Sequence, residues 1–260
     1  MALAVLLSAG MPLDAHADGV QKKSMVAPPG SSAHAAIADF SGVWRIVGFS
    51  EVMRPEDSNP EYTEEALRRI RNFEQHYDEA EDSPAKFCYH EGMPWSMVHR
   101  ARDYPTEIYQ SADRVMLFHE GMDIYRHIRL DTKTFPENYV PSAQGYSIAH
   151  WDGGDLIIET RGLTATNEVG AHHRSEEARV IERWHLIKQP NMPDRWEITF
   201  TLEDPVIFKK PARGRQLMER AEAGTVVGGY NCPQALWDDY IASIKEQREG
   251  EPAEDKPAGE

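Results

Sequence analysis

The sequence predicts a mainly β protein that folds as a single antiparallel β-barrel of about nine strands, with a packed N-terminal helix and a C-terminal helix. Short runs rich in aromatic and β-branched residues follow one another at regular spacing from residue 106 onward, and turn residues separate them. No helical pattern interrupts this series, which is typical of strands joined by hairpins. We expect the sheet to close on itself, because closure removes its unpaired edges.

Alternation of apolar and polar residues assigns the individual strands. The first strand lies within Phe40–Phe49, and the others are expected at Thr106–Gln110, Val115–Glu120, Ile124–Asp131, Gly145–Trp151, Asp155–Leu163, Ala178–Lys188, Arg195–Glu203 and Val206–Lys209. The strongest local signal is the segment Trp151-Asp-Gly-Gly-Asp155, because Asp and Gly tolerate the positive φ angles of a tight hairpin.

Two helices are expected outside the sheet. Asn59 and Pro60 supply an N-cap and a first-turn proline for a helix over about Glu61–Glu79, whose apolar stripe we expect to pack on the barrel. A second helix is expected over Pro233–Gln247. The chain then divides into a signal peptide (1–17), a flexible leader (18–38), the barrel domain (39–247) and a disordered acidic tail (248–260).

Charge and the N-terminal segment indicate the compartment. The formal charge is −15, with 43 acidic and 28 basic residues, which argues against nucleic acid as a partner. The first residues form a short apolar run followed by Ala15-His16-Ala17, which resembles a secretory signal peptide cleaved after Ala17. No later run approaches the roughly 20 apolar residues of a membrane span. We therefore expect a soluble, exported protein that is periplasmic or secreted.

The chain has two cysteines, Cys88 and Cys232. In an oxidising compartment a single disulfide is the simpler interpretation, and it would tie the C-terminal segment to the barrel. The alternative is two separate thiols, and the sequence does not supply the Cα separation that would decide between them.

Ionisable residues on otherwise apolar strands mark the candidate site. Glu182 shares a face with Val180 and Trp184, and if this face is the inner one, the buried carboxylate needs a partner or a ligand. We predict His173 and Glu182 as an acid/base pair with Arg126 holding an anionic group. The predicted ligand-binding residues are Glu120, Tyr146, Trp151, Trp184 and Arg183.

Each of these residues also has a structural interpretation. Glu182 and Arg126 can form a buried ion pair that only fixes the strand register, and Trp151 and Trp184 can be core aromatics. Arg183 lies on the opposite strand face from Glu182, so both line one cavity only if a bulge intervenes. The pair His172-His173 can lie in a solvated loop.

Motifs for metal and cofactor binding do not support such a site. Neither His-x-His nor His-x-x-x-His occurs, although the chain has 11 histidines. The sequence has no Gly-x-Ser-x-Gly elbow, no phosphate-binding glycine loop and no nucleotide or flavin fingerprint. We therefore expect no metal and no cofactor.

Several motifs together resemble a large family of uncharacterised secreted bacterial proteins. They are Cys88-Tyr-His-Glu-Gly-Met-Pro94, Glu107-Ile-Tyr-Gln110, Gly145-Tyr-Ser-Ile-Ala-His-Trp151-Asp-Gly-Gly-Asp155-Leu, His172-His-Arg-Ser175, Glu182-Arg183, Asp204-Pro205 and Cys232. Ala149, Asp152 and the inserted Arg174 depart from the family pattern, and we prefer His173 over His172 at the family's histidine position. The resemblance implies an exported, lipocalin-like β-rich domain with both cysteines paired, and it implies no agreed activity.

These observations favour an exported, cofactor-independent enzyme that moves a proton on an apolar or aromatic small molecule bound in the barrel, as an isomerase or lyase does. The alternative is a periplasmic carrier without chemistry, in which the same charged residues anchor one polar end of the ligand. A third hypothesis is an envelope interaction protein, which predicts a barrel filled with side chains and a cavity below a few hundred Å³. The sequence does not indicate the oligomeric state.

Overall fold

The computed structural model describes residues 38–49, 61–90, 92–94, 96, 104–166, 173–188, 190–232 and 237–243. The expected signal peptide, leader and acidic tail lie outside these residues, as do His172 and the expected helix start at Asn59 and Pro60. No helix in the described ranges is long and apolar enough to cross a membrane.

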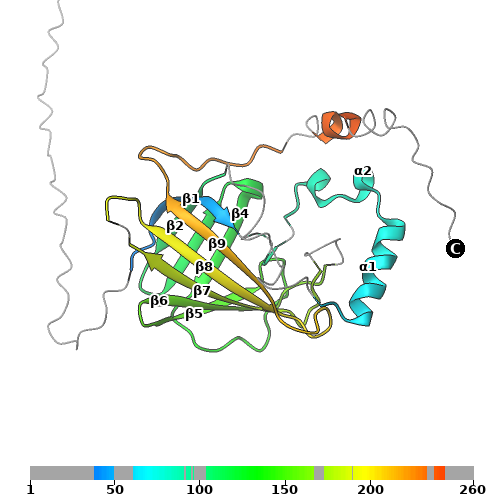
Figure 1. The fold of residues 1–260 in the computed structure, drawn as a ribbon, viewed down its shortest axis with the longest axis horizontal. Coiled ribbons are helices and arrows are strands. Elements are labelled where there is room, and N and C mark those ends of the chain that lie inside the picture. The colour runs from blue at the N-terminus through cyan, green and yellow to red at the C-terminus, as the bar shows by residue number, and fades with distance from the viewer. Residues whose placement is uncertain are drawn as a thin grey trace, which may run out of the picture. The chain divides into compact units, whose positions relative to one another are not determined.

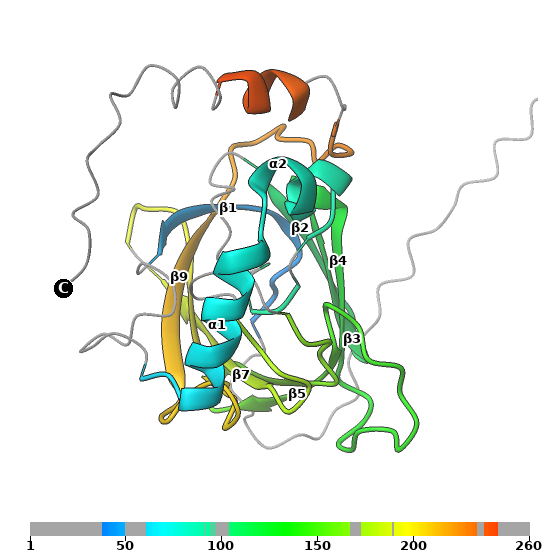
Figure 2. The ribbon, with the colours of Figure 1, turned by 90° about the vertical axis from the view of Figure 1, so that its right-hand side faces the viewer.

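Nine strands form a closed barrel in this part of the chain, which confirms the expected fold class (Figures 1 and 2). The strands are β1 (Gly42–Phe49), β2 (Thr106–Gln110), β3 (Arg114–His119), β4 (Ile124–Arg129), β5 (Tyr146–Asp152), β6 (Asp155–Arg161), β7 (Arg179–Ile187), β8 (Arg195–Glu203) and β9 (Ala212–Arg220). Strands adjacent in the sequence are adjacent in the sheet, and β1 closes the barrel against β9.

The barrel is mixed, so the expectation of a purely antiparallel sheet is wrong at one position. β4 and β5 pair in parallel, with Ile128 opposite Ser147 and Arg129 opposite Ile148. Strand directions cannot alternate all the way around a closed ring with an odd number of strands, so one parallel pair is required. Residues 130–145 meet this requirement by running back along the barrel before β5 begins.

The ninth strand is also not the expected one. Val206 and Ile207 lie in a turn, in which the Asp204 side chain accepts hydrogen bonds from the backbone N–H groups of Val206 (3.1 Å) and Ile207 (3.3 Å), and Phe208 forms only an isolated bridge with Tyr62. β9 instead follows, with Ala212, Gly214, Gln216 and Met218 facing inward. Small and polar residues on the inner face hide the alternating pattern from sequence analysis.

Helix α1 (Glu64–His76) begins later than expected. Thr63 is its N-cap, with Oγ1 accepting a hydrogen bond from the Ala66 N–H at 3.1 Å, and Ala66 is the buried residue of the helix. The Thr63 backbone N–H also donates to the Ile207 carbonyl at 2.9 Å, which anchors the start of α1 to the β8–β9 connection. Figures 1 and 2 show α1 beside this end of the barrel.

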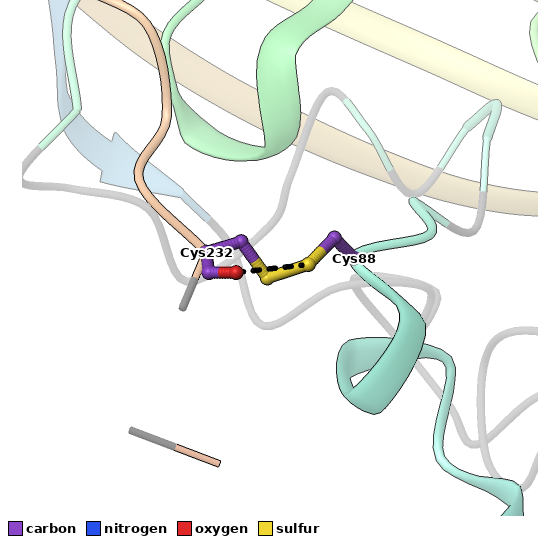
Figure 3. The surroundings of a disulfide bond; sticks show 2 residues. All are labelled: Cys88 and Cys232. Carbon is purple, nitrogen blue, oxygen red and sulfur yellow. Dashed lines mark hydrogen bonds between the residues drawn. A yellow bond between two sulfur atoms is a disulfide. The ribbon is translucent and has the colours of Figure 1, made fainter. Parts of the chain in front are cut away.

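The remaining short helices are α2 (Glu79–Asp82), η1 (Pro84–Phe87) and η2 (Gly121–Asp123), the last joining β3 to β4. A disulfide joins Cys88, which follows η1, to Cys232, with the two Cα atoms 6.2 Å apart (Figure 3). This separation lies in the usual range for disulfides. Of the predicted C-terminal helix, residues 237–243 are described and are helical.

The barrel interior is an apolar core rich in aromatic side chains. Its largest fully buried members are Phe40, Trp44, Trp184, Trp196, Phe200, Met93, Ile108, Ile128, Leu156, Ile158 and Leu163. Phe40 lies before β1 and contacts three tryptophans, with ring centroids 3.7 Å from Trp196, 5.5 Å from Trp184 and 5.6 Å from Trp151. Phe40 therefore joins the segment just before β1 to the aromatic core.

Gly214 on β9 has a packing role that yields a test. A Cβ atom there would lie 2.2 Å from the Phe200 ring, so only glycine allows the ring to fill this part of the interior. We predict that Gly214→Ala lowers the free energy of unfolding by about 1–3 kcal/mol, the usual cost of overpacking a core. Urea denaturation would measure the loss.

Gly48→Ala is the matched control for this prediction. A Cβ atom at Gly48 would make only ordinary contact with Leu217, at 3.6 Å. The double variant Gly214→Ala/Phe200→Leu should recover part of the lost stability. Equal stabilities of Gly214→Ala and Gly48→Ala would contradict this account of the packing.

Candidate functional site

A buried ion pair spans the barrel interior from β4 to β7. Arg126 and Glu182 have side-chain exposures of 4% and 0%. Arg126 Nη1 donates to Glu182 Oε2 at 2.9 Å, and Nη2 donates to Oε1, so the contact is bidentate. Such fork-to-fork contacts combine charge attraction with fixed geometry. The sequence interpretation in which these two residues pair is the one that the structure shows.

Neighbouring side chains satisfy more of the pair's hydrogen-bonding capacity. Arg126 Nη2 also donates to Thr160 Oγ1 at 3.0 Å and to Ser147 Oγ at 3.3 Å. Trp184 Nε1 donates to Glu182 Oε2 at 2.9 Å. Both carboxylate oxygens therefore accept charge-assisted or indole hydrogen bonds, which offset the cost of removing the charges from water. The cluster joins β4, β5, β6 and β7 in one register.

A small, partly open pocket lies beside Arg126 and Trp184. Its volume is about 40 Å³, enough for a few water molecules or the end group of a small molecule. Within the described part of the chain, its lining consists of Ile46, Ser96, Thr106, Leu117, His119, Ile124, Arg126, Trp184, Ile198, Gln216 and Met218. Six apolar and five polar side chains thus meet in one space, in the mixture that small-molecule sites use.

Gln216 on β9 is the least satisfied polar group of this lining. The residue is 3% exposed, and within the described part of the chain no hydrogen bond to its side-chain amide is seen. Its amide atoms are not fully enclosed by protein atoms, because they border the partly open pocket. Buried polar groups almost always find a protein, water or ligand partner. The Gln216 amide is therefore available to hydrogen-bond whatever fills the pocket, either water or the polar group of a ligand.

His119 and Thr106 form a second polar group in the pocket wall. They lie opposite each other on β3 and β2, both buried, with His119 Nδ1 and Thr106 Oγ1 at 2.8 Å. This hydrogen bond orients the imidazole ring. A histidine held in this way is a suitable hydrogen-bonding or proton-transfer group.

The other predicted site residues lie in two different places. Arg126 and Trp184 line the pocket, and Glu182 lies directly behind them. Arg183 points outward, where it pairs with Asp155 at 2.6 Å, as the strand alternation requires. Tyr146 stacks under the Arg129 guanidinium, 4.2 Å from its ring centroid, and Glu120 accepts a hydrogen bond from the Gly228 N–H at 2.8 Å.

Trp151 and His173 have other neighbours. Trp151 stacks on Phe40. His173 is 1% exposed, so it does not lie in a solvated loop, and its ring meets Tyr62 edge-on with centroids 6.4 Å apart. Burial raises the pKa of the Tyr62 hydroxyl. His173 and Glu182 thus sit in different surroundings, the first beside the segment before α1 and the second beside Arg126.

Ser175 and Asp204, which belong to the sequence motifs given above, form hydrogen bonds with each other. Ser175 donates through its backbone N–H and through Oγ, at 2.5 and 2.8 Å, to the two Asp204 carboxylate oxygens. The same carboxylate caps the turn after β8, so it joins the start of β7 to the β8–β9 connection. The contact thus holds together two residues that lie 29 positions apart in the sequence.

Sequence reasoning missed Gln216, His119 and Thr106. β9 was not expected, so Gln216 had no assigned face, although alternation from Met218 would have placed it inward. From the segment of β3 the sequence analysis chose Glu120, whereas the side chains of β3 that face inward are Val115, Leu117 and His119. Among the described residues, no group of three or more His, Cys, Asp or Glu side chains is arranged to hold a metal ion.

Neither a scan against protein-family models nor a search of curated proteins finds a match to this chain. The resemblance to a family of secreted bacterial proteins therefore stays a prediction. The fold and the pocket are the basis for assigning a function.

The ion pair yields a test of stability. We predict that Glu182→Gln lowers the free energy of unfolding by about 3–5 kcal/mol, because it leaves the Arg126 charge buried without a counter-charge. Chemical denaturation would measure this loss. The control is Glu197→Gln on the outer face of β8, whose partner Arg215 lies 3.1 Å away and is 44% exposed. That change should cost about 1 kcal/mol or less.

Arg126→Leu/Glu182→Leu removes both charges and should cost less than Glu182→Gln, since apolar residues can replace a buried pair. A Glu182→Gln loss as small as that of Glu197→Gln would show that the ion pair does not hold the barrel together.

Proposed function

We propose that this protein binds a small, mostly apolar molecule with one polar end, and that the barrel pocket holds the polar end. The observation that carries the proposal is the buried Gln216 amide, which lacks a hydrogen-bond partner among the described residues and lines an otherwise largely apolar pocket. A ligand that supplies this hydrogen bond takes the place of water at the amide.

The pocket volume limits the part of the ligand that is enclosed. About 40 Å³ is far below the roughly 300–1,000 Å³ of a site that encloses a whole drug-sized molecule. Only the end group of a ligand fits, and the rest would extend through the open side. The small volume also favours the third hypothesis, an interaction protein with a filled barrel, so the binding test must separate the two.

The proposal also includes the location of the protein, which is the periplasm or the outside of the cell. The Cys88–Cys232 disulfide is typical of proteins that fold in an oxidising environment. Together with the signal-like N-terminal sequence, it supports export to the periplasm or beyond. A carrier or enzyme for an apolar compound in the cell envelope would need this location.

Filling the pocket should abolish ligand binding. We predict that Leu117→Trp, or the smaller change Leu117→Phe if the first does not fold, lowers affinity at least tenfold, because the larger ring occupies the space of the ligand's end group. The measurement is ligand-observed NMR with a mixture of small aromatic and aliphatic molecules that each carry one polar group. Native mass spectrometry of the purified protein would reveal any molecule that co-purifies.

Met116→Trp is the control, because Met116 lies next to Leu117 but is 41% exposed on the outer face. Binding that survives in Met116→Trp and is lost in Leu117→Trp supports the pocket. A folded wild-type protein that binds none of these molecules would support the filled barrel instead.

A cofactor-independent proton-transfer enzyme is the second candidate function. The specific observation in its favour is the His119 ring, which the Thr106 hydrogen bond orients in the pocket wall. In this mechanism His119 takes or gives the proton on the bound molecule, as imidazoles do near neutral pH. The ion-paired Glu182 has a positioning role, since both of its oxygens already accept hydrogen bonds.

The two functions differ in what happens to a bound ligand. If the protein is an enzyme, a molecule identified by binding is recovered changed, and His119→Gln lowers turnover by about 10²–10⁴-fold while binding persists. NMR of the ligand during incubation would follow the conversion. A ligand returned unchanged by the wild-type protein would assign the carrier function.

A further inference from the structure

We propose that the pocket selects an uncharged end group that both donates and accepts a hydrogen bond, such as a primary amide or a lactam, over a carboxylate. This inference rests on the proposed binding function and names the chemical class of its ligand. It differs from the sequence expectation that Arg126 holds an anionic group.

The first argument is the charge of the pocket. Among the described lining residues Arg126 carries the permanent charge, and Glu182 neutralises it through two hydrogen bonds. Its Nη2 atom also serves Ser147 and Thr160. An anionic ligand would therefore add a net negative charge to a buried region whose positive charge is already matched. Removing such an uncompensated charge from water is costly.

The second argument is the chemistry of the remaining polar groups. A glutamine amide offers one acceptor oxygen and an NH₂ donor side by side, which matches a ligand group with the same two functions. Gln216 faces the pocket from β9, whereas Thr106 and His119 face it from β2 and β3. A hydroxyl and an imidazole each serve as donor or acceptor. The wall as a whole therefore suits a neutral group with mixed hydrogen bonding.

The third argument is the apolar remainder of the wall. Ile46, Leu117, Ile124, Ile198 and Met218 offer no hydrogen bonds, and the Trp184 indole N–H already donates to Glu182. A polar ligand group that lies against these residues, away from Gln216, Thr106, His119 and Ser96, would be left unsatisfied. The enclosed part of the ligand is thus a neutral polar head next to an apolar body.

The test compares three molecules of nearly equal shape. Benzamide both donates and accepts, acetophenone only accepts, and benzoate is an anion. Dissociation constants would be measured with the full-length protein by NMR at pH 8, where an unperturbed imidazole is neutral. We expect benzamide to bind on the order of tenfold more tightly than acetophenone, the value of about one hydrogen bond, and benzoate to bind most weakly.

Gln216→Leu identifies the residue responsible. This variant keeps the side-chain volume similar but removes the amide, so the preference for benzamide over acetophenone should fall to within about twofold. Arg213→Leu introduces the same residue on the outer face of β9, where Arg213 is exposed, and should keep the wild-type preference. Thermal denaturation would show that both variants are folded.

The outcomes separate this inference from the proposed function. Tighter binding of benzoate than of benzamide, or a preference that persists in Gln216→Leu, would overturn the inference and leave the binding function in place. A folded wild-type protein that binds none of the three molecules would count against the binding function, and the inference would fail with it.

Discussion

The contact between Arg126 and Glu182 is the interaction on which the rest of the interior depends. It joins β4 to β7 across the barrel interior. Ser147, Thr160 and Trp184 form further hydrogen bonds with the pair. Two buried charges are tolerated only when geometry and hydrogen bonding are this complete. The pair therefore sets which residues of β4 to β7 face inward. It also places Trp184 and Arg126 in the wall of the pocket.

The same pair determines the electrostatic character of the site. A lone guanidinium in the pocket would attract anions, and a lone carboxylate would serve as a base. Because each charge neutralises the other, the remaining side chains that offer hydrogen bonds to the pocket include Gln216, His119 and Thr106. In the proposed binding function these side chains would hydrogen-bond the ligand, and the ion pair would support the wall behind them.

The connection from β1 to β2 covers one side of this arrangement. Met93 is fully buried in the core, its N–H donates to the Ala143 carbonyl at 2.9 Å, and Ser96 lines the pocket. The disulfide from Cys88 to Cys232 ties this connection to the segment after β9. That segment is held further by Glu120 and Asp123, which accept hydrogen bonds from Gly228 and Tyr230. Covalent and polar links thus hold the segments next to the pocket.

The sequence by itself determined the barrel, eight of its strands and the placement of Glu182 and Arg183 on opposite strand faces, because alternation along a strand is a local property. Which of the two faces points inward was decided by the tertiary structure. The sequence did not reveal β9, most of whose inner residues are small or polar, or the parallel β4–β5 pair, which follows from closure of the whole ring. The pocket was decided only by the tertiary structure. Gln216, His119 and Arg126 come from three strands, and no local pattern records which side chains of a closed sheet meet across its interior.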